Sequence, residues 1–213
     1  PTFFEAEAKR FRLADTAASL AQSEKASRKS AALLRARVIA RRDVAENTVC
    51  LSIVAAGETD LPAWQPGSHI DVHIRPGLVR QYSLTGPFVP GIYRIAVQKE
   101  EKSTGGSIAM HEKYGVNAAI LVGAPRNNFQ MDEAASDALL FSGGIGMTPI
   151  LAMAWRLHAL GRPFSWHLSA RSPGRLPFSS ELDALPFRHR IHLHIDDASD
   201  GVPFDAQEAL RSS

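Results

Sequence analysis

The first part of the chain with a clear hydrophobic pattern runs from residue 38 to about residue 130. Short runs in which apolar and polar residues alternate are separated by turns rich in Gly and Pro, such as Pro66-Gly67 and Pro76-Gly77. Alternation with a period of two is typical of half-buried strands, and the turn residues mark where each strand ends. The predicted strands lie at residues 38–40, 48–53, 69–74, 81–84 and 93–97. This pattern predicts an antiparallel β barrel.

From residue 138 the pattern changes to apolar runs that alternate with helical segments. The predicted strands cover residues 138–142, 164–168 and 191–195, with one helix through Trp155 and another near residues 180–185. Strands that alternate with helices predict a parallel sheet with crossover connections, the architecture of nucleotide-binding domains. Three strands are fewer than such a sheet usually has. We therefore expect an α/β domain at residues 134–213 whose C-terminal end is missing.

The residues before the barrel have a different composition. Residues 1–36 are rich in Ala, Lys, Arg, Glu and Ser and contain no Gly, which predicts a helical leader or linker before a barrel domain at residues 37–133. Residues 1–42 carry ten Lys and Arg against four Asp and Glu. A basic segment can bind nucleic acid or an acidic partner, but a solvated helix is the simpler interpretation. We expect no nucleic-acid partner.

Composition narrows the class of protein further. With 213 residues, 45% of them apolar, the chain is long enough to bury a core, so we expect globular domains rather than disorder. No apolar run approaches the roughly 20 residues that cross a bilayer, and we expect a cytoplasmic protein with no membrane partner. Cys50 is the single cysteine, so the chain cannot supply the four thiolates of a plant-type iron–sulfur cluster.

A glycine-rich turn is the strongest local motif. The residues Gly143-Gly144-Ile145-Gly146-Met147-Thr148-Pro149 follow a predicted buried strand and precede a predicted helix. Glycines let the backbone turn tightly and approach a ligand, while the free N–H groups at a helix start favour a phosphate or a polarised ring edge. We expect Thr148 to cap the helix, Pro149 to occupy its first turn and Gly161 to end it.

Two further motifs lie in the predicted barrel. In Arg80-Gln81-Tyr82-Ser83-Leu84 a cation, an aromatic ring and a hydroxyl follow one another on a strand, with Arg80, Tyr82 and Leu84 expected on one face. Gly105-Gly106-Ser107 precedes a predicted short helix at residues 109–114 and has the small residues of an anion cradle, in which Ser107 caps the helix or binds the anion. Each motif alone also fits an ordinary strand or loop, but their order favours a cofactor site.

Taken with Pro125-Arg126-Asn127-Asn128-Phe129, these motifs resemble the signature series of the ferredoxin–NADP reductase superfamily. Within it, the chain resembles the phthalate dioxygenase reductase branch, which also includes vanillate O-demethylase reductases and the reductase segment of self-sufficient cytochromes P450. The resemblance covers roughly residues 36–200. It implies an FMN-binding barrel and an NADH-binding domain that normally deliver electrons through a 2Fe–2S ferredoxin domain, in the same or another polypeptide, to a terminal oxygenase. The chain would thus be a flavin-dependent NAD(P)H oxidoreductase.

The resemblance also implies roles for individual residues. Arg80, with Gly105, Gly106 and Ser107, would bind the FMN phosphate; Gln81, Tyr82, Ser83 and Leu84 would line the flavin, with Ser83 near its N5 edge. Ala96 and Val97 would lie beside the flavin ring, and Gly144, Gly146 and Thr148 would stand between flavin and nicotinamide. Arg171 would reach the ribose or phosphate of the nucleotide. Ser83 and Thr148 are the expected catalytic positions.

Two alternatives remain open at this stage. In the first, the chain is an FAD-containing ferredoxin–NADP reductase. In the second, it is no enzyme but a non-catalytic flavin-bearing docking subunit of a larger complex. His192 and His194 share a strand face near Asp196 and Asp197. A polar strand edge explains these residues better than a metal site, and we predict none.

Overall fold

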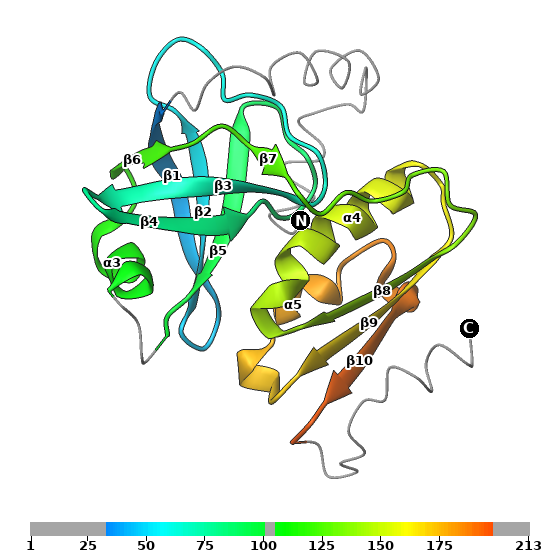
Figure 1. The fold of residues 1–213 in the computed structure, drawn as a ribbon. Helices are drawn as coiled ribbons and strands as arrows, with labels where there is room; N and C mark the ends of the chain where they lie inside the picture. Colours follow the sequence, from blue (N-terminus) through cyan, green and yellow to red (C-terminus); the bar gives the residue numbers. More distant parts are fainter. Residues whose placement is uncertain (1–32, 101–104, 198–213) are drawn as a thin grey trace.

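The computed structural model describes residues 33–100 and 105–197, which form an antiparallel barrel beside a small α/β unit (Figure 1). Residues 1–32 of the expected helical leader lie outside the described residues. The barrel strands are β1 (Leu34–Ala45), β2 (Thr48–Ala55), β3 (Ser68–Arg75), β4 (Leu78–Ser83), β5 (Ile92–Gln98), β6 (Ala119–Val122) and β7 (Arg126–Asn127). The expected antiparallel barrel is therefore present.

The barrel strands run in the order β4-β3-β6-β1-β2-β5, and β7 pairs with β3. A single antiparallel bridge between Leu84 and Ile95 joins the two ends of this order and closes the barrel. Alternate residues of β2, β3 and β5, including Ile53, Ile70 and Ile95, are fully buried and fill the interior. The apolar residues that recur with a period of two in the sequence are thus the ones that fill the barrel interior.

The first strand begins earlier than the sequence predicts. Leu34, Arg35 and Ala36, assigned to the helical leader, pair with Val122, Leu121 and Ile120 of β6. Their helix-favouring neighbours gave no strand signal, and the pairing partner β6 was not predicted as a strand because its apolar run has only four residues. Tertiary pairing overrides the local composition here.

The α/β unit contains a parallel sheet in the order β10-β9-β8, formed by β8 (Ala138–Gly143), β9 (Phe164–Ala170) and β10 (Ile191–Ile195). Between them lie α4 (Met147–Ala159) and α5 (Ser179–Leu182), with single 3-10 turns η1 (Gly144–Gly146), η2 (Pro173–Arg175) and η3 (Arg188–Arg190). The three predicted strands and the first helix are confirmed, whereas α5 is shorter than the predicted segment. Gly161 follows α4 with a φ of 65° and ends it as expected.

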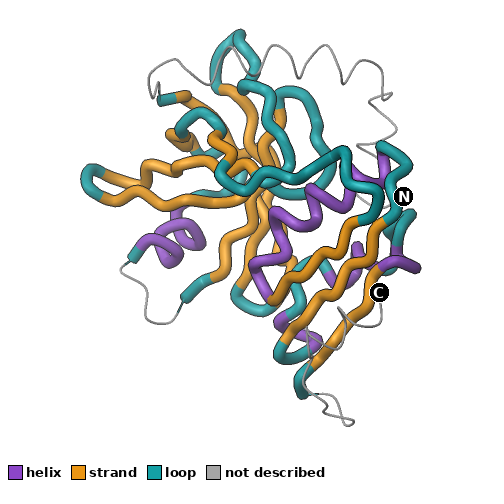
Figure 2. Tube along the Cα trace, turned by 45° about the vertical axis from the view of Figure 1, so that its right-hand side comes forward, coloured by secondary structure: helices purple, strands orange, loops and turns teal. Residues whose placement is uncertain are grey.

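The long helix α4 lies between the parallel sheet and the barrel (Figures 1 and 2). Its residues Ile150, Leu151, Met153, Ala154 and Leu157 are buried in the core that it shares with the sheet. Ala152, on another side of the helix, packs with the barrel core. Two barrel residues, Cys50 and Ala96, in turn pack within the core of the α/β unit. The two units therefore share apolar contacts on both sides of their junction.

Candidate functional site

One end of the barrel is covered by α3 (Gly106–Lys113), which packs against β3, β4 and β5 (Figure 1). Arg80 and Tyr82 of β4 pair with the fully buried Val72 and Ile70 of β3, so the two side chains share a face as predicted. The side chain of Arg80 lies directly against Gly106. A Cβ at Gly106 would stand 2.6 Å from the Arg80 Nε atom, so only glycine permits this approach.

The first turn of α3 has the electrostatics of an anion site. Its own residues include no acidic side chain, and among the described residues no side chain caps its N–H groups; Gly105, at the cap, has a φ of 93°. Ser107 does not cap the helix, because its Oγ accepts a hydrogen bond from the Glu100 backbone N–H at 3.1 Å. The Ser107 hydroxyl proton can still donate elsewhere. Arg80, the helix N-terminus and Ser107 together form a cradle with the positive charge and hydrogen-bond donors of an anion site.

Tyr82 lies beside this cradle and is half-buried. Burial raises the pKa of Tyr82 to about 12, although the positive charge of Arg80 acts in the opposite direction. The charges of Glu100 and Tyr114 also raise the pKa. Tyr82 therefore stays a neutral aromatic ring, which suits contact with a flat conjugated ligand. Ser83 ends β4 opposite His69, and Leu84 is fully buried in the barrel core.

Gln81 points to the other face of β4, where an ion pair holds the neighbouring strands. Arg126 donates to both carboxylate oxygens of Asp71, at 2.7 and 2.8 Å. This bidentate pair is the main reason that the pKa of Asp71 is lowered; burial opposes it, and a hydrogen bond with Gln81 adds to it. Gln81 thus has a structural contact on the opposite face of the strand from Arg80 and Tyr82.

The glycine-rich turn occupies the predicted place between β8 and α4. Gly144 has a φ of 49°, a left-handed conformation that favours glycine, whereas the φ of Gly146 is −63°. A Cβ at either position would meet no described atom within 4 Å. The turn also contacts β5. Its two glycines therefore border space next to the barrel, as a close backbone approach to a ligand requires.

Thr148 does not cap α4. It is the second residue of the helix, and its hydroxyl donates to the Ile145 carbonyl oxygen at 3.0 Å. The cap position belongs to Gly146, without a side-chain hydrogen bond. A residue already inside the helix reaches a carbonyl of the preceding turn more easily than a free N–H group, so the prediction was wrong by two positions. Thr148 is buried and stabilises the shape of the turn. Pro149 lies in the first turn as expected.

Ala96 and Val97 have different surroundings although they are neighbours on β5. Ala96 faces the α/β unit and packs within its core, whereas Val97 is fully buried inside the barrel. The Val97 carbonyl oxygen lies 2.9 Å from Nε2 of His111 on α3. Ala96 is therefore the member of the pair that faces the junction beside the glycine-rich turn.

Arg171 is exposed just after the end of β9, and its carbonyl oxygen accepts a hydrogen bond from the Asp197 N–H at 3.0 Å.

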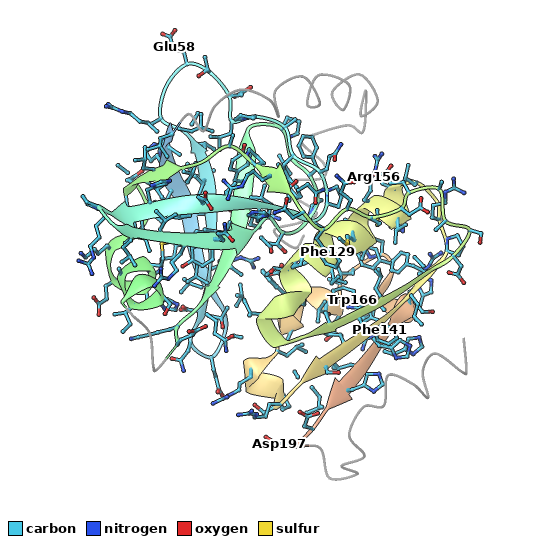
Figure 3. The ribbon with its side chains drawn as sticks, in the orientation of Figure 1. Glu58, Phe129, Phe141, Arg156, Trp166 and Asp197 are labelled. Carbon is cyan, nitrogen blue, oxygen red and sulfur yellow. The ribbon has the colours of Figure 1, made fainter. Side chains whose placement is uncertain are left out.

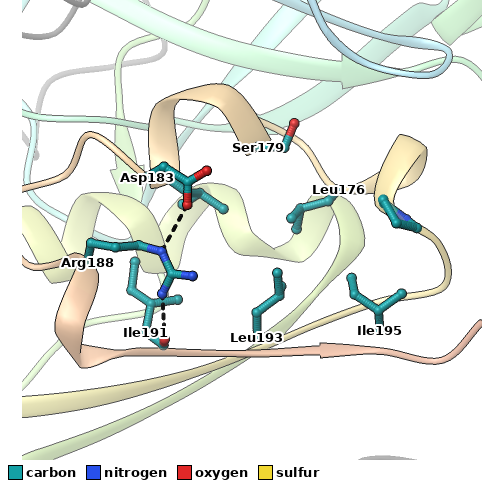
Figure 4. Close-up of a pocket in the computed structure, with 9 residues that line it drawn as sticks. Leu176, Ser179, Asp183, Arg188, Ile191, Leu193 and Ile195 are labelled. Atoms are coloured by element: carbon teal, nitrogen blue, oxygen red, sulfur yellow. Dashed lines mark hydrogen bonds and ion pairs between the residues drawn. The ribbon is translucent and has the colours of Figure 1, made fainter. Parts of the chain in front are cut away.

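An apolar pocket of about 240 Å³ lies at the outer strand β10, where Arg188 donates hydrogen bonds to Asp183 and to the Ile191 carbonyl oxygen (Figure 4). None of the predicted cofactor residues lines it. We therefore place the candidate site between the cradle at α3, the strands β4 and β5, and the glycine-rich turn that contacts β5, and not in this pocket.

The sheet face that points away from α4 carries a histidine cluster. Trp166 packs toward the helix, whereas Phe141 lies on the opposite face with His167 (Figure 3). The His167 Nδ1 and His194 Nε2 atoms are 3.1 Å apart, and the His192 ring stacks on His167. Across residues 33–100 and 105–197, no group of three or more His, Cys, Asp or Glu side chains could hold a metal ion.

The structure also shows a junction that the sequence did not predict. Arg42 of β1 forms an ion pair with the buried Glu181 of α5. Burial raises the pKa of Cys50, close by on β2, to about 11, although Arg94 and Arg42 lower it. Residues 42 and 181 are far apart in sequence and lie in ordinary polar surroundings, so no local signal could have identified them.

Among the described helices, none is both long and apolar enough to span a membrane.

Comparisons with known proteins agree with this geometry. No protein-family model matches the chain. A vanillate O-demethylase oxidoreductase of a Pseudomonas species is 39% identical over 174 residues, which is 81% of this chain and 55% of the relative. A toluene-4-sulfonate monooxygenase system reductase subunit of Comamonas testosteroni is 40% identical over 176 residues, with the same two shares.

A solved structure of phthalate dioxygenase reductase matches with a TM-score of 0.79 and 30% identity, over 85% of this chain and 57% of that one. That protein is described as a modular structure for electron transfer from pyridine nucleotides to a 2Fe–2S centre. The chain spans about half the length of the curated relatives that it matches.

Proposed function

From the premise that the chain belongs to the phthalate dioxygenase reductase-like branch of the ferredoxin–NADP reductase superfamily, we propose that it is the flavin- and nucleotide-binding part of an oxygenase reductase. In this proposal the chain binds FMN and NADH and passes electrons to a 2Fe–2S ferredoxin domain or protein that serves an oxygenase. The observation that carries the proposal is the cradle in which Arg80 lies against Gly106 at the start of α3.

The cradle supports FMN because it offers one compact anion site. Arg80 supplies a positive charge directly against Gly106, the first residue of α3, and no described side chain caps the N–H groups of this first turn. A single phosphate has the size and charge that such a site takes. We propose that Gly105, Gly106 and Ser107 hold the phosphate together with Arg80.

The ring site would lie between β4, β5 and the glycine-rich turn. Tyr82 offers a neutral aromatic face, and Ser83 ends the same strand with a hydroxyl. Ala96 faces the junction from β5. We propose that Tyr82 packs on the isoalloxazine, that Ser83 donates toward its N5 edge, and that Gln81 acts only through Asp71 on the other strand face.

On the nucleotide side, Gly144 and Gly146 would admit the nicotinamide, since a Cβ at either would occupy the space beside the turn. Thr148 would hold the turn in shape through its hydrogen bond to the Ile145 carbonyl oxygen rather than contact the transferred hydride. Arg171, exposed at the end of β9, would reach the ribose or phosphate of the nucleotide. When bound, the flavin supplies the conversion from a two-electron donor to one-electron delivery. No side chain has to act as acid or base, so the chain's task is to position both ligands and exclude water.

Two measurements test the proposal. Rapid mixing of the flavin-loaded protein with NADH should bleach the flavin absorbance; an unchanged spectrum would leave the docking-subunit alternative. Acid release of the bound flavin followed by chromatography should yield FMN. Release of FAD would instead assign the chain to the FAD-containing reductases.

A further inference from the structure

A seam between the end of β1 and the segment at residues 174–181 joins the barrel to the α/β unit. The Glu46 N–H, just after β1, donates to the Gly174 carbonyl oxygen, and the Phe178 N–H donates to the Val44 carbonyl oxygen, both at 2.8 Å. Arg42 adds the ion pair with Glu181. The three contacts thus follow one another along five residues of the chain, from 42 to 46. The end of β1 and the turn after it therefore form the barrel side of the seam.

The backbone at Phe178 shows that the seam determines local structure. Phe178 is buried and has a φ of 60°, a conformation that a bulky residue adopts only when its surroundings hold it there. Its N–H is bonded to Val44, while its own carbonyl oxygen accepts from the N–H groups of Glu181 and Leu182. The position of Glu181 is therefore set through β1 twice, by the backbone bond at Val44 and by the guanidinium of Arg42.

The ion pair is the part of the seam with the greatest electrostatic contribution. Glu181 is 5% exposed, so its carboxylate depends on Arg42 for compensation of its charge. Arg42 is partly exposed and can be hydrated if Glu181 is replaced. Burial by itself lowers the pKa of Arg42, but Glu181 reverses this and raises it overall. The pair therefore holds the two units in one relative orientation.

We infer that Arg42 and Glu181 are positioning residues for electron transfer: together with the Val44–Phe178 and Glu46–Gly174 bonds, they hold the glycine-rich turn at a constant distance from the flavin-binding strands. This inference rests on the proposed function. The turn and α5 pack in the core of the α/β unit, while Arg80, Tyr82 and Ala96 lie on strands β4 and β5 of the barrel. Rotation of one unit on the other would change the separation of the two ligands.

The test compares Glu181→Gln with Asp183→Asn in the flavin-loaded chain. Asp183 lies next to the same helix and forms an ion pair with Arg188, but it is exposed and does not reach the barrel. We expect Glu181→Gln to lower the rate constant of flavin reduction by about tenfold or more, with the NAD⁺ dissociation constant changed by less than about twofold. Asp183→Asn should leave both unchanged. Rates are expressed per bound flavin, so a partial loss of cofactor does not obscure the comparison.

Amide hydrogen exchange gives a second readout that does not need activity. Protection of the Phe178 and Glu46 N–H groups should fall in Glu181→Gln and stay at the parent level in Asp183→Asn. The double variant Arg42→Gln/Glu181→Gln should behave like Glu181→Gln alone, because the pair is already lost. Unchanged reduction rate and unchanged protection in Glu181→Gln would overturn the inference. If the parent chain fails to react with NADH, the proposed function fails instead, and the exchange data alone decide the role of the seam.

Discussion

The barrel and the α/β unit differ in how closely packed they are at the proposed ligand site. At the barrel end, side chains are already in contact: Arg80 lies against Gly106, and Tyr82 is held beside them. At the turn of the α/β unit, Gly144 and Gly146 border open space, because no described atom lies within 4 Å of where a Cβ would stand on either residue. In the proposed site, the first region would bind through charge and packing, whereas the second would leave room for the ligand. A substitution should therefore weaken the first region by removing its charge or disturbing its packing, and the second by adding a group.

The largest effect is expected from the cation. Arg80→Gln removes the charge of the cradle, and we expect the flavin dissociation constant to rise about tenfold to a hundredfold, since hydrogen bonds to charged groups are worth about 1.5–3 kcal/mol. Fluorescence titration of the flavin-free protein measures this. Arg75→Gln, at the exposed last residue of β3, is the control and should bind flavin normally. Equal affinity in both variants would mean that the phosphate lies elsewhere.

The second effect tests packing at the same end. Gly106→Ala would place a Cβ at 2.6 Å from Arg80 Nε and displace the guanidinium, so we expect flavin affinity to fall about tenfold, or about 1.4 kcal/mol. Gly115→Ala is the matched control, because its Cβ would meet no described atom within 4 Å. Thermal unfolding of both variants separates a loss of affinity from a loss of fold. Normal binding by Gly106→Ala would show that the close approach has no role in the cradle.

The third effect concerns the open side. Gly146 has a right-handed backbone that alanine adopts without strain, and its Cβ would meet no described atom nearby. We expect Gly146→Ala to keep its melting temperature and flavin content while NADH affinity falls about threefold to tenfold, roughly 1 kcal/mol. Gly144→Ala should in addition destabilise the protein by about 1 kcal/mol, because its φ is positive. If Gly146→Ala reacts with NADH like the parent, the turn does not approach the nucleotide.

The smallest effect concerns the histidine cluster on the far face of the parallel sheet. Burial, followed by the charges of neighbouring histidines, lowers the pKa values of His167 and His194. Folding therefore favours their neutral forms, so this contribution to stability is complete above about pH 6.5 and is lost as the pH falls through and below that value. His194→Gln should reduce the acid sensitivity of the unfolding free energy by less than about 0.5 kcal/mol, since both rings are partly solvated. Urea unfolding at pH 7.5 and pH 5.5 measures it, with the exposed His189→Gln as control; an undiminished pH dependence would exclude the cluster as its source.

Much of the fold follows from local patterns. The alternation in β2, β3 and β5 and the apolar runs of β8, β9 and β10 lie where the sequence predicts strands. The glycine-rich turn also has its predicted strand–turn–helix context. The errors have two causes. Leu34 to Ala36 became a strand because β6 pairs with them, and Thr148 lies inside the helix instead of capping it because its hydroxyl bonds the Ile145 carbonyl oxygen.

The sequence by itself therefore determined the two units and their strand periods, because burial alternates with the backbone period and special turns require glycine; the flavin-site residues stay a prediction. Only the tertiary structure brought Arg80 against Gly106 and Arg42 against Glu181. Contacts between residues that are distant in the chain depend on how strands pair and how the two units pack together, and no local sequence pattern encodes these contacts. The cradle and the seam are consequences of packing, although every residue in them is visible in the sequence.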